Sequence, residues 1–181
     1  MQSSKLVIQQ VQCWIKNVVI AHNICPFAKR EFDSGRIRYR QMHEELAYSL
    51  DDVLQECQHL DNNQDVETSL LIYPTGLEDF DSFWEYCAIA EQLLLDSGYE
   101  GIYQLASFHP DYCFEGSHDD DPANYTNRAP YPMLHIIREA SLEKALQNYP
   151  NPEEIPERNI RYTQELGLNT MKALLKNCLA Q

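Results

Sequence analysis

Segments with helical periodicity alternate along this chain with short segments of strand character, and this order constrains the fold more than any other feature. From about Leu6 to His22, apolar residues recur three and four positions apart, whereas from Ile37 to Met42 they alternate with arginines. The first spacing is typical of an amphipathic helix and the second of a half-buried strand. Such alternation favours a sheet covered by helices, an α/β layered fold.

The same patterns continue to the C-terminus. Ser141 is expected to cap a short helix that ends near Leu146, and a helical tail after Pro156 is expected to break near Gly167. We therefore predict a single domain, residues 1–181, with a roughly four-stranded mixed sheet, packed helices and a helical C-terminal tail. The other expected elements are a helix from about 46 to 57, a polar turn at 61–65, a helix at 79–96 with Gly98 just past its end, and strands at 68–73, 102–108 and 133–138. The expected core face of the helix at 79–96 comprises Phe80, Phe83, Trp84, Cys87, Leu94 and Leu95.

The composition suits a globular protein and argues against some partners. The 181 residues can fill one hydrophobic core, and 44% of them are apolar and 23% charged. A formal net charge of −14 argues against a protein that mainly wraps nucleic acid or an anionic membrane. The net charge does not exclude a local basic pocket, because residues 29–40 contain five basic side chains: Lys29, Arg30, Arg36, Arg38 and Arg40.

The expected compartment follows from the first segment and from the thiols. Polar residues interrupt the first apolar segment, no small-residue cleavage site follows it, and no apolar run approaches the roughly 20 residues of a membrane helix. The six cysteines are scattered without a CxxC pair, which favours reduced thiols over a disulfide framework. We therefore expect a cytoplasmic protein without a membrane segment.

A polar loop from His109 to Tyr131 is where we expect a functional site. It follows the expected strand 102–108 and has almost no aliphatic residues. Loops of this length in compact domains are usually functional or disordered, and the prolines and aromatics here favour order. His109 lies at the end of the strand, at a sheet edge where sites commonly form. Its imidazole and the carboxylate of Asp111 are groups that acid–base catalysis requires.

The same loop raises the alternative of a divalent-metal site. Imidazoles and carboxylates are metal ligands, and the acidic run Asp119–Asp121 lies within the loop. The spacing matches no specific zinc or calcium motif. In the competing interpretation, Asp111 and the acidic run cap turns in water. Metal-assisted hydrolysis therefore stays an alternative, and these patterns specify neither a metal nor a cofactor.

A second group of candidate residues lies between Asn124 and Glu139. Guanidinium groups clamp carboxylates and phosphates, so Arg128 and Arg138 are candidate ligands of an anionic substrate, together with Asn124 and Glu139. Alternation along a strand puts His135 and Arg138 on opposite faces, so they would not converge directly. In the competing interpretation, Arg138 pairs with Glu139 and His135 is a hydrogen-bonded core residue.

Cys25 is the most specific candidate for a functional residue outside the loop. Pro26 suits the first position of a helix, and residues 27–32 are expected to form a short one with Cys25 as its N-cap. Helix N–H groups and nearby basic residues favour a thiolate. A thiolate facing His109 or His135 would make a pair of nucleophile and base. The competing interpretation is an inert buried thiol.

Four longer segments, residues 23–30, 106–112, 124–135 and 156–160, read NICPFAKR, ASFHPDY, NYTNRAPYPMLH and PERNI. They resemble a bacterial protein family catalogued as domain of unknown function 1415. The resemblance covers essentially the whole chain and implies a self-contained single domain, with no established activity, cofactor or catalytic residue. Cys113 and His118 depart from the family pattern, which weakens any mechanism through either. The matching positions include all the candidates: Cys25, His109, Asp111, Asn124, Arg128, His135, Arg138 and Glu139.

Two functions of different classes follow from these candidates. The first is an enzyme that acts on a small anionic substrate, through His109 oriented by Asp111 or through Cys25 as nucleophile, with His135 as a further catalytic candidate. The second is a non-catalytic module that binds a metabolite or a protein through the aromatic residues of the loop. Substrate and oligomeric state are left open.

Overall fold

The computed structural model describes residues 3–42 and 46–180. None of the described helices is both long and apolar enough to cross a bilayer. The π-helical segment η1 continues α1, and η2 and η3 are short 3₁₀ helices. The elements are α1 (Ser4–Trp14), η1 (Ile15–Ile20), α2 (Ala28–Asp33), β1 (Ile37–Gln41), α3 (Leu46–Asn62), β2 (Thr68–Ile72), α4 (Phe80–Asp96), β3 (Tyr103–Phe108), η2 (Pro122–Thr126), β4 (Met133–Arg138), α5 (Glu139–Gln147), η3 (Pro152–Glu154), α6 (Ile155–Leu166) and α7 (Leu168–Leu179).

The four strands form one open sheet of mixed direction in the order β1-β2-β4-β3. β1 pairs parallel with β2, and β4 pairs antiparallel with both β2 and β3. The mixed four-stranded sheet predicted from the sequence is therefore confirmed. β4, the last strand in the sequence, lies inside the sheet, so β1 and β3 are the two edge strands.

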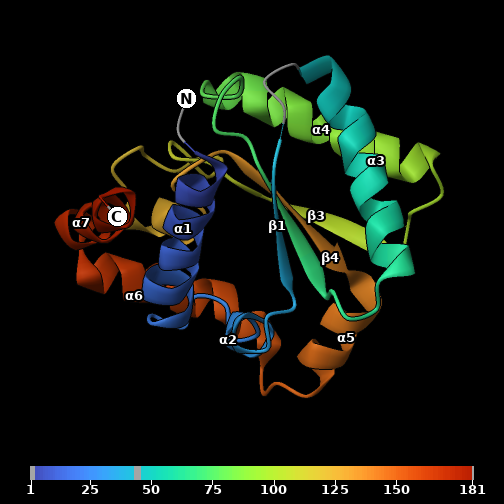
Figure 1. Ribbon diagram of the computed structural model, residues 1–181. Helices are drawn as coiled ribbons and strands as arrows, with labels where there is room; N and C mark the ends of the chain where they lie inside the picture. The colour runs from blue at the N-terminus through green and yellow to red at the C-terminus, as the bar shows by residue number, and fades with distance from the viewer. Residues whose placement is uncertain (1–2, 43–45, 181) are drawn as a thin grey trace.

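Helices cover both faces of this sheet (Figure 1). Side chains alternate along β2, so Leu71 and Tyr73 join the core under α3 and α4, whereas Leu70 and Ile72 join the core under α1 and α7. Both cores are dominated by aliphatic and aromatic side chains, which explains the near-continuous apolar sequence of β2. The α/β layered fold is thus built from the periodicities that predicted it.

Two boundaries differ from the expectation, and a third is confirmed. Ser141 is not a cap, because α5 begins at Glu139 directly after β4, where the carboxylate suits the positive helix N-terminus. The polar turn expected at 61–65 starts later, because α3 continues to Asn62. A tertiary contact supports this last turn, since the Tyr103 hydroxyl donates to Asp61 Oδ1 at 2.8 Å. The break in the helical tail at Gly167, with a φ of 78°, is confirmed.

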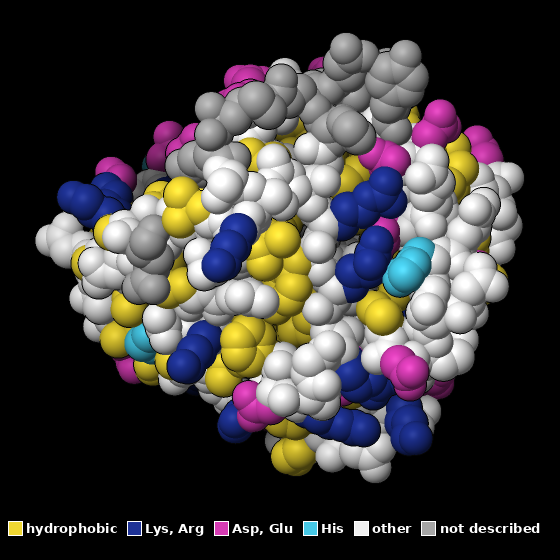
Figure 2. All heavy atoms as spheres, viewed as in Figure 1, with side chains coloured by type: hydrophobic (Ala, Val, Ile, Leu, Met, Phe, Trp, Pro, Cys, Tyr) yellow, Lys and Arg dark blue, Asp and Glu magenta, His cyan; other side chains and the backbone are white. Residues whose placement is uncertain are grey.

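The arginines of β1 are used to attach this edge strand to α3. Arg38 Nε lies 2.6 Å from Glu56 Oε1, and Arg40 lies 2.6 Å from Asp52 and 3.2 Å from Glu56. The side chain of Glu56 is 1% exposed and also accepts a hydrogen bond from Ser69 Oγ at 2.6 Å. Figure 2 shows several dark blue basic side chains beside magenta acidic ones on this face. The basic cluster noted in the sequence is therefore largely neutralised by ion pairs.

Candidate functional site

His109 lies at the end of β3, fully buried against the rings of Phe80 and Phe83. Its Nε2 faces the carbonyl oxygen of Leu77 at 3.0 Å, and its Nδ1 accepts the N–H of Asp111 at 3.0 Å. These contacts assign the neutral tautomer with the proton on Nε2. Burial lowers the pKa of His109, although the Leu77 carbonyl opposes this shift. Both ring nitrogens are thus occupied by backbone groups that fix the start of the loop.

Asn124 stabilises the loop through hydrogen bonds of its buried side chain. Its side chain is completely buried in η2. Asn124 Oδ1 accepts the N–H of Phe114 at 3.1 Å, and Nδ2 donates to the carbonyl oxygen of His118 at 2.8 Å. The amide therefore ties together backbone groups on both sides of the turn at 114–118. Its hydrogen bonds are those of a loop scaffold.

Arg128 also binds backbone. Its Nε donates to the carbonyl oxygen of Tyr112 at 2.9 Å, and a terminal nitrogen donates to that of Asp119 at 3.0 Å. The guanidinium lies over the ring of Tyr125, 4.9 Å from its centroid. Asp111 is exposed at the surface of the same loop. The structure therefore brings His109, Asp111, Asn124 and Arg128 into one loop, where three of the four side chains hold its backbone.

His135 and Arg138 lie on opposite faces of the sheet, as alternation along β4 predicts. Thr68 Oγ1 donates to the carbonyl oxygen of Ile136 at 2.6 Å, so it accepts the Nε2 proton of His135 at 2.5 Å. Burial lowers the pKa of His135 to about 4, which leaves the ring neutral at pH 7. His135 is thus the hydrogen-bonded histidine of the competing interpretation.

Arg138 caps the C-terminal end of α3. One terminal nitrogen lies 2.6 Å from the carbonyl oxygen of Leu60 and 3.1 Å from that of Val66, and the other lies 3.0 Å from the Tyr103 hydroxyl. A cation at this position stabilises the negative helix end. Glu139 follows it at the start of α5 and lines a surface depression described below.

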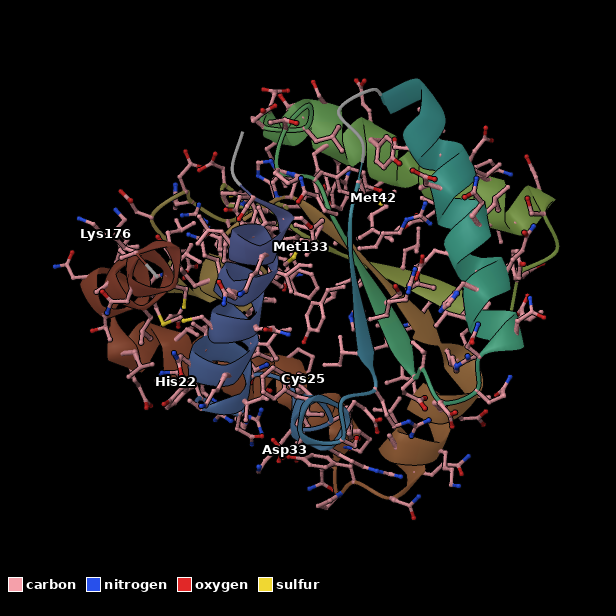
Figure 3. The ribbon with its side chains drawn as sticks, in the orientation of Figure 1. His22, Cys25, Asp33, Met42, Met133 and Lys176 are labelled. Carbon is pink, nitrogen blue, oxygen red and sulfur yellow. The ribbon has the colours of Figure 1, made fainter. Side chains whose placement is uncertain are left out.

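Cys25 lies in the turn that precedes α2 (Figure 3). The prediction that it is a helix N-cap is wrong: α2 begins at Ala28, because residues 25–27 form a turn closed by the Ala28 N–H and the Cys25 carbonyl oxygen at 3.3 Å. Burial raises the pKa of the Cys25 thiol, while hydrogen bonds from the N–H groups of Phe27 and Ala28 and the charge of Arg158 lower it in part. Burial outweighs the stabilisation of the thiolate.

Helix α6 holds this turn in place. Asn159 Nδ2 donates to the carbonyl oxygen of Ile24 at 2.7 Å, and Arg158 donates to that of Asn23. Asn23 has a φ of 52°, a conformation that asparagine tolerates better than most residues. Among the described residues, no hydrogen bond joins Cys25 to His109 or His135. The polar contacts of His109 and His135 thus do not involve the turn, although Cys25 packs against the core that also contains Tyr125 and Ala129 of the loop.

A row of aromatic rings runs from α4 to the loop and reaches solvent at both ends. The ring centroids of Phe80 and Tyr112 lie 5.4 Å apart, those of Trp84 and Tyr112 6.4 Å, and those of Tyr112 and Phe114 5.0 Å. Tyr112 is buried, whereas Trp84 is 54% and Phe114 38% exposed. Exposed aromatic side chains that pack against fixed neighbours are typical of interaction surfaces.

Two shallow depressions lie beside the exposed edge of β3. One has a volume of about 360 Å³ and lies on the α5 side, where it is lined by Gln104, Glu139 and Leu142 among others. The second, of about 260 Å³, lies on the α4 side, where Glu91 and Leu95 contribute to it. Gln104 lines both, so the two depressions flank the same edge strand.

These features define one continuous region, which we call the α4–β3 surface. Trp84, Glu91 and Leu95 are spaced along α4 on one side of the helix, and β3 runs antiparallel to it toward Tyr112. The aromatic row therefore lies at one end and the depressions at the other. The α4–β3 surface comprises Phe80, Trp84, Glu91, Leu95, Gln104, Leu105, Tyr112, Phe114 and Glu139.

Sequence reasoning did not single out Trp84 or the edge of β3. Helical periodicity predicts Trp84 on the core face of its helix, but Phe83, Cys87, Ala90 and Leu94 form the buried face, and Trp84 lies outside it. The order of strands in a sheet is not encoded in local periodicity, so nothing local marked β3 as an edge. Within the part of the chain that the structure describes, no three His, Cys, Asp or Glu side chains gather as a metal-binding group.

The fold and the surface define an α/β protein whose mixed sheet is covered on both faces and whose edge strand β3 is flanked by aromatic, leucine and glutamate side chains. The chain belongs to the family described as protein of unknown function (DUF1415), whose model matches residues 6–173. The match confirms the resemblance noted in the four sequence segments. Comparisons with curated proteins and with solved structures gave no match.

Proposed function

We propose that this chain is a non-catalytic binding protein that recognises a segment of a partner protein on the α4–β3 surface. The observation that carries the proposal is the exposure of Trp84 and Phe114 on a fixed aromatic base. Tryptophan and tyrosine are enriched among the residues that dominate binding energy. A ring that is already held in place loses little conformational entropy when a partner covers it.

The chemistry of the loop agrees with a binding role. Two of the candidates for catalysis and anion binding bind backbone groups instead: His109 through both ring nitrogens, and Arg128 through carbonyl oxygens. Removing them from these contacts would leave buried polar groups without partners, at a cost of roughly 1–3 kcal/mol each. Their arrangement supports a rigid loop that presents Tyr112 and Phe114.

An enzyme with Cys25 as nucleophile is the second candidate function. It is favoured by the hydrogen bonds from the Phe27 and Ala28 N–H groups and by the charge of Arg158. Burial acts against it, because it favours the neutral thiol. We rank this candidate below the binding function for that reason, and its decisive measurement is described in the Discussion.

Selection from a random peptide library displayed on phage tests the binding function. The immobilised wild-type protein is compared with a W84A/F114A double variant, whose two substitutions remove exposed side chains and leave the cores intact. We expect the wild type to enrich sequence families that the double variant does not enrich. Enrichment of the same families by both proteins, or of none by the wild type, would refute the proposal.

A further inference from the structure

The two edge strands of the sheet differ in their protection against pairing with another strand. β1 reads IRYRQ and carries two arginines in ion pairs, whereas β3 reads YQLASF and contains neither a charged residue nor a proline. Charged side chains and prolines are the usual means by which proteins protect an edge strand. β3 thus offers pairing groups without the common safeguards.

The register shows which backbone groups of β3 face outward. The N–H of Glu139 donates to the carbonyl oxygen of Ile102 at 3.0 Å, so Ile102 and Glu139 form a hydrogen-bonded pair. Alternation then directs Gln104 and Ala106 toward β4 and leaves the N–H and C=O groups of Leu105 pointing away from it. At the end of β3, Asn127 Nδ2 donates to the outward carbonyl oxygen of Ser107 at 3.2 Å. A side chain therefore closes the edge there, and its open part lies near Leu105.

The surroundings of this open edge specify what would bind to it. The carboxylates of Glu91, Glu100, Glu139 and Glu143 line the two depressions, and none of the described lining residues is basic. Apolar side chains lie between them, and Leu95 is 48% exposed. The complementary partner is an extended segment with lysine or arginine and apolar residues. A second copy of this acidic chain would bring carboxylates against carboxylates.

We propose that a basic, extended segment of the partner adds as a fifth strand to the outer edge of β3. This inference rests on the proposed binding function and specifies its mode and the chemistry of its partner. Backbone groups of the segment pair with Leu105, while its side chains alternate between the depressions on the α4 and α5 sides. The open stretch of the edge is short, because the outward N–H of Tyr103 already donates to the carbonyl oxygen of Tyr99 at 3.2 Å and Asn127 occupies Ser107 at the other end. The added strand is therefore centred on Leu105, and the rest of the segment continues over α4 toward Trp84.

A fluorescent octapeptide of alternating lysine and valine is the probe, and a glutamate–valine octapeptide is its matched control. Anisotropy is measured with the wild type, W84A and E91Q/E139Q. Amide hydrogen exchange is then followed by NMR at Leu105, with Ala106, whose backbone already faces β4, as internal control. We expect the control peptide to bind the wild type at least tenfold more weakly than the lysine–valine peptide does. The lysine–valine peptide should bind E91Q/E139Q at least tenfold more weakly than it binds the wild type. Saturating lysine–valine peptide should slow exchange at Leu105 at least tenfold and leave Ala106 unchanged.

Other results separate this inference from the function on which it rests. Trp84-dependent binding of the lysine–valine peptide with unchanged exchange at Leu105 overturns strand addition but supports the binding function. If both peptides bind with equal affinity, the inference that the partner segment is basic is wrong. If the free protein sediments as a dimer and its Leu105 amide is protected from exchange, a second copy of the chain occupies the edge. That result overturns the proposal that a partner peptide binds there. If library peptides bind only the wild type and the lysine–valine peptide does not bind, only this inference is wrong.

Discussion

The ring of Trp84 on α4 meets the ring of Tyr112, which follows β3, at a centroid distance of 6.4 Å and an interplanar angle of 77°. Tyr112 is buried, and its carbonyl oxygen accepts a hydrogen bond from Arg128. The exposed indole is therefore supported by a ring that the loop scaffold holds in place. This contact links the role of the loop to the surface that we propose for binding.

Glu56 tests the ion-pair network of β1. Replacing Glu56 with glutamine leaves Arg38 and Arg40 facing a buried neutral group, and we expect the free energy of unfolding to fall by about 2–4 kcal/mol. D33N removes the exposed pair with Lys29 and should change it by less than about 0.5 kcal/mol. Urea denaturation measures both. A loss below about 1 kcal/mol in E56Q would contradict the structural role of the network.

His135 predicts a pH dependence of stability. Its pKa is lowered from 6.5 to about 4, so the unfolded chain binds a proton that the folded protein does not bind between these pH values. The contribution of His135 to the free energy of unfolding is fully present above pH 6.5. It decreases as the pH falls toward 4, by up to about 3 kcal/mol in total. H135Q should show a shallower fall than the wild type over this range. The exposed His118, changed to glutamine, is the control, and equal pH profiles of H135Q and the wild type would contradict the account.

Cys25 distinguishes the two candidate functions. Because burial raises the pKa of its thiol, we expect iodoacetamide to modify Cys25 in the folded protein at pH 7.5 roughly tenfold more slowly than in the urea-unfolded chain. Site-resolved mass spectrometry gives both rates. Faster modification in the folded state, persisting to pH 6, would reveal a stabilised thiolate and favour the enzyme.

Asn124 tests the loop scaffold. N124A removes the acceptor of the Phe114 N–H and the donor to the His118 carbonyl oxygen, and leaves both groups without these partners. We expect a loss of about 2–3 kcal/mol in the free energy of unfolding and faster proteolysis within residues 113–121. S117A removes an exposed hydroxyl contact and serves as control. Unchanged proteolysis in N124A would show that the loop is held by other contacts.

Much of the fold was predictable because periodicity reports local structure. The arginine alternation of β1, the helix stop before Gly98 and the break at Gly167 all identified real boundaries. The predicted helix start at Ser141 is wrong, because β4 passes directly into α5 and this helix needs no separate capping residue. The expected separation of His135 and Arg138 on opposite faces followed from the period of a strand alone.

The candidate site was less predictable, because residue type does not specify what a side chain contacts. His109, Asn124 and Arg128 are chemically capable residues, yet their partners are backbone groups brought close by the loop. Trp84 and Leu95 looked like core residues until the packing of α4 showed which side of the helix faces the sheet. Local sequence does not contain that information.

The affinity of a library-selected peptide for W84A, compared with I160A, tests the binding function most directly. Both substitutions remove large exposed apolar side chains, but Ile160 lies on α6, away from the α4–β3 surface. If Trp84 dominates binding, W84A weakens the affinity measured by calorimetry roughly 30-fold or more, a loss of about 2 kcal/mol. I160A should remain within about twofold of the wild type. Equal affinities of W84A and the wild type would contradict binding at the α4–β3 surface.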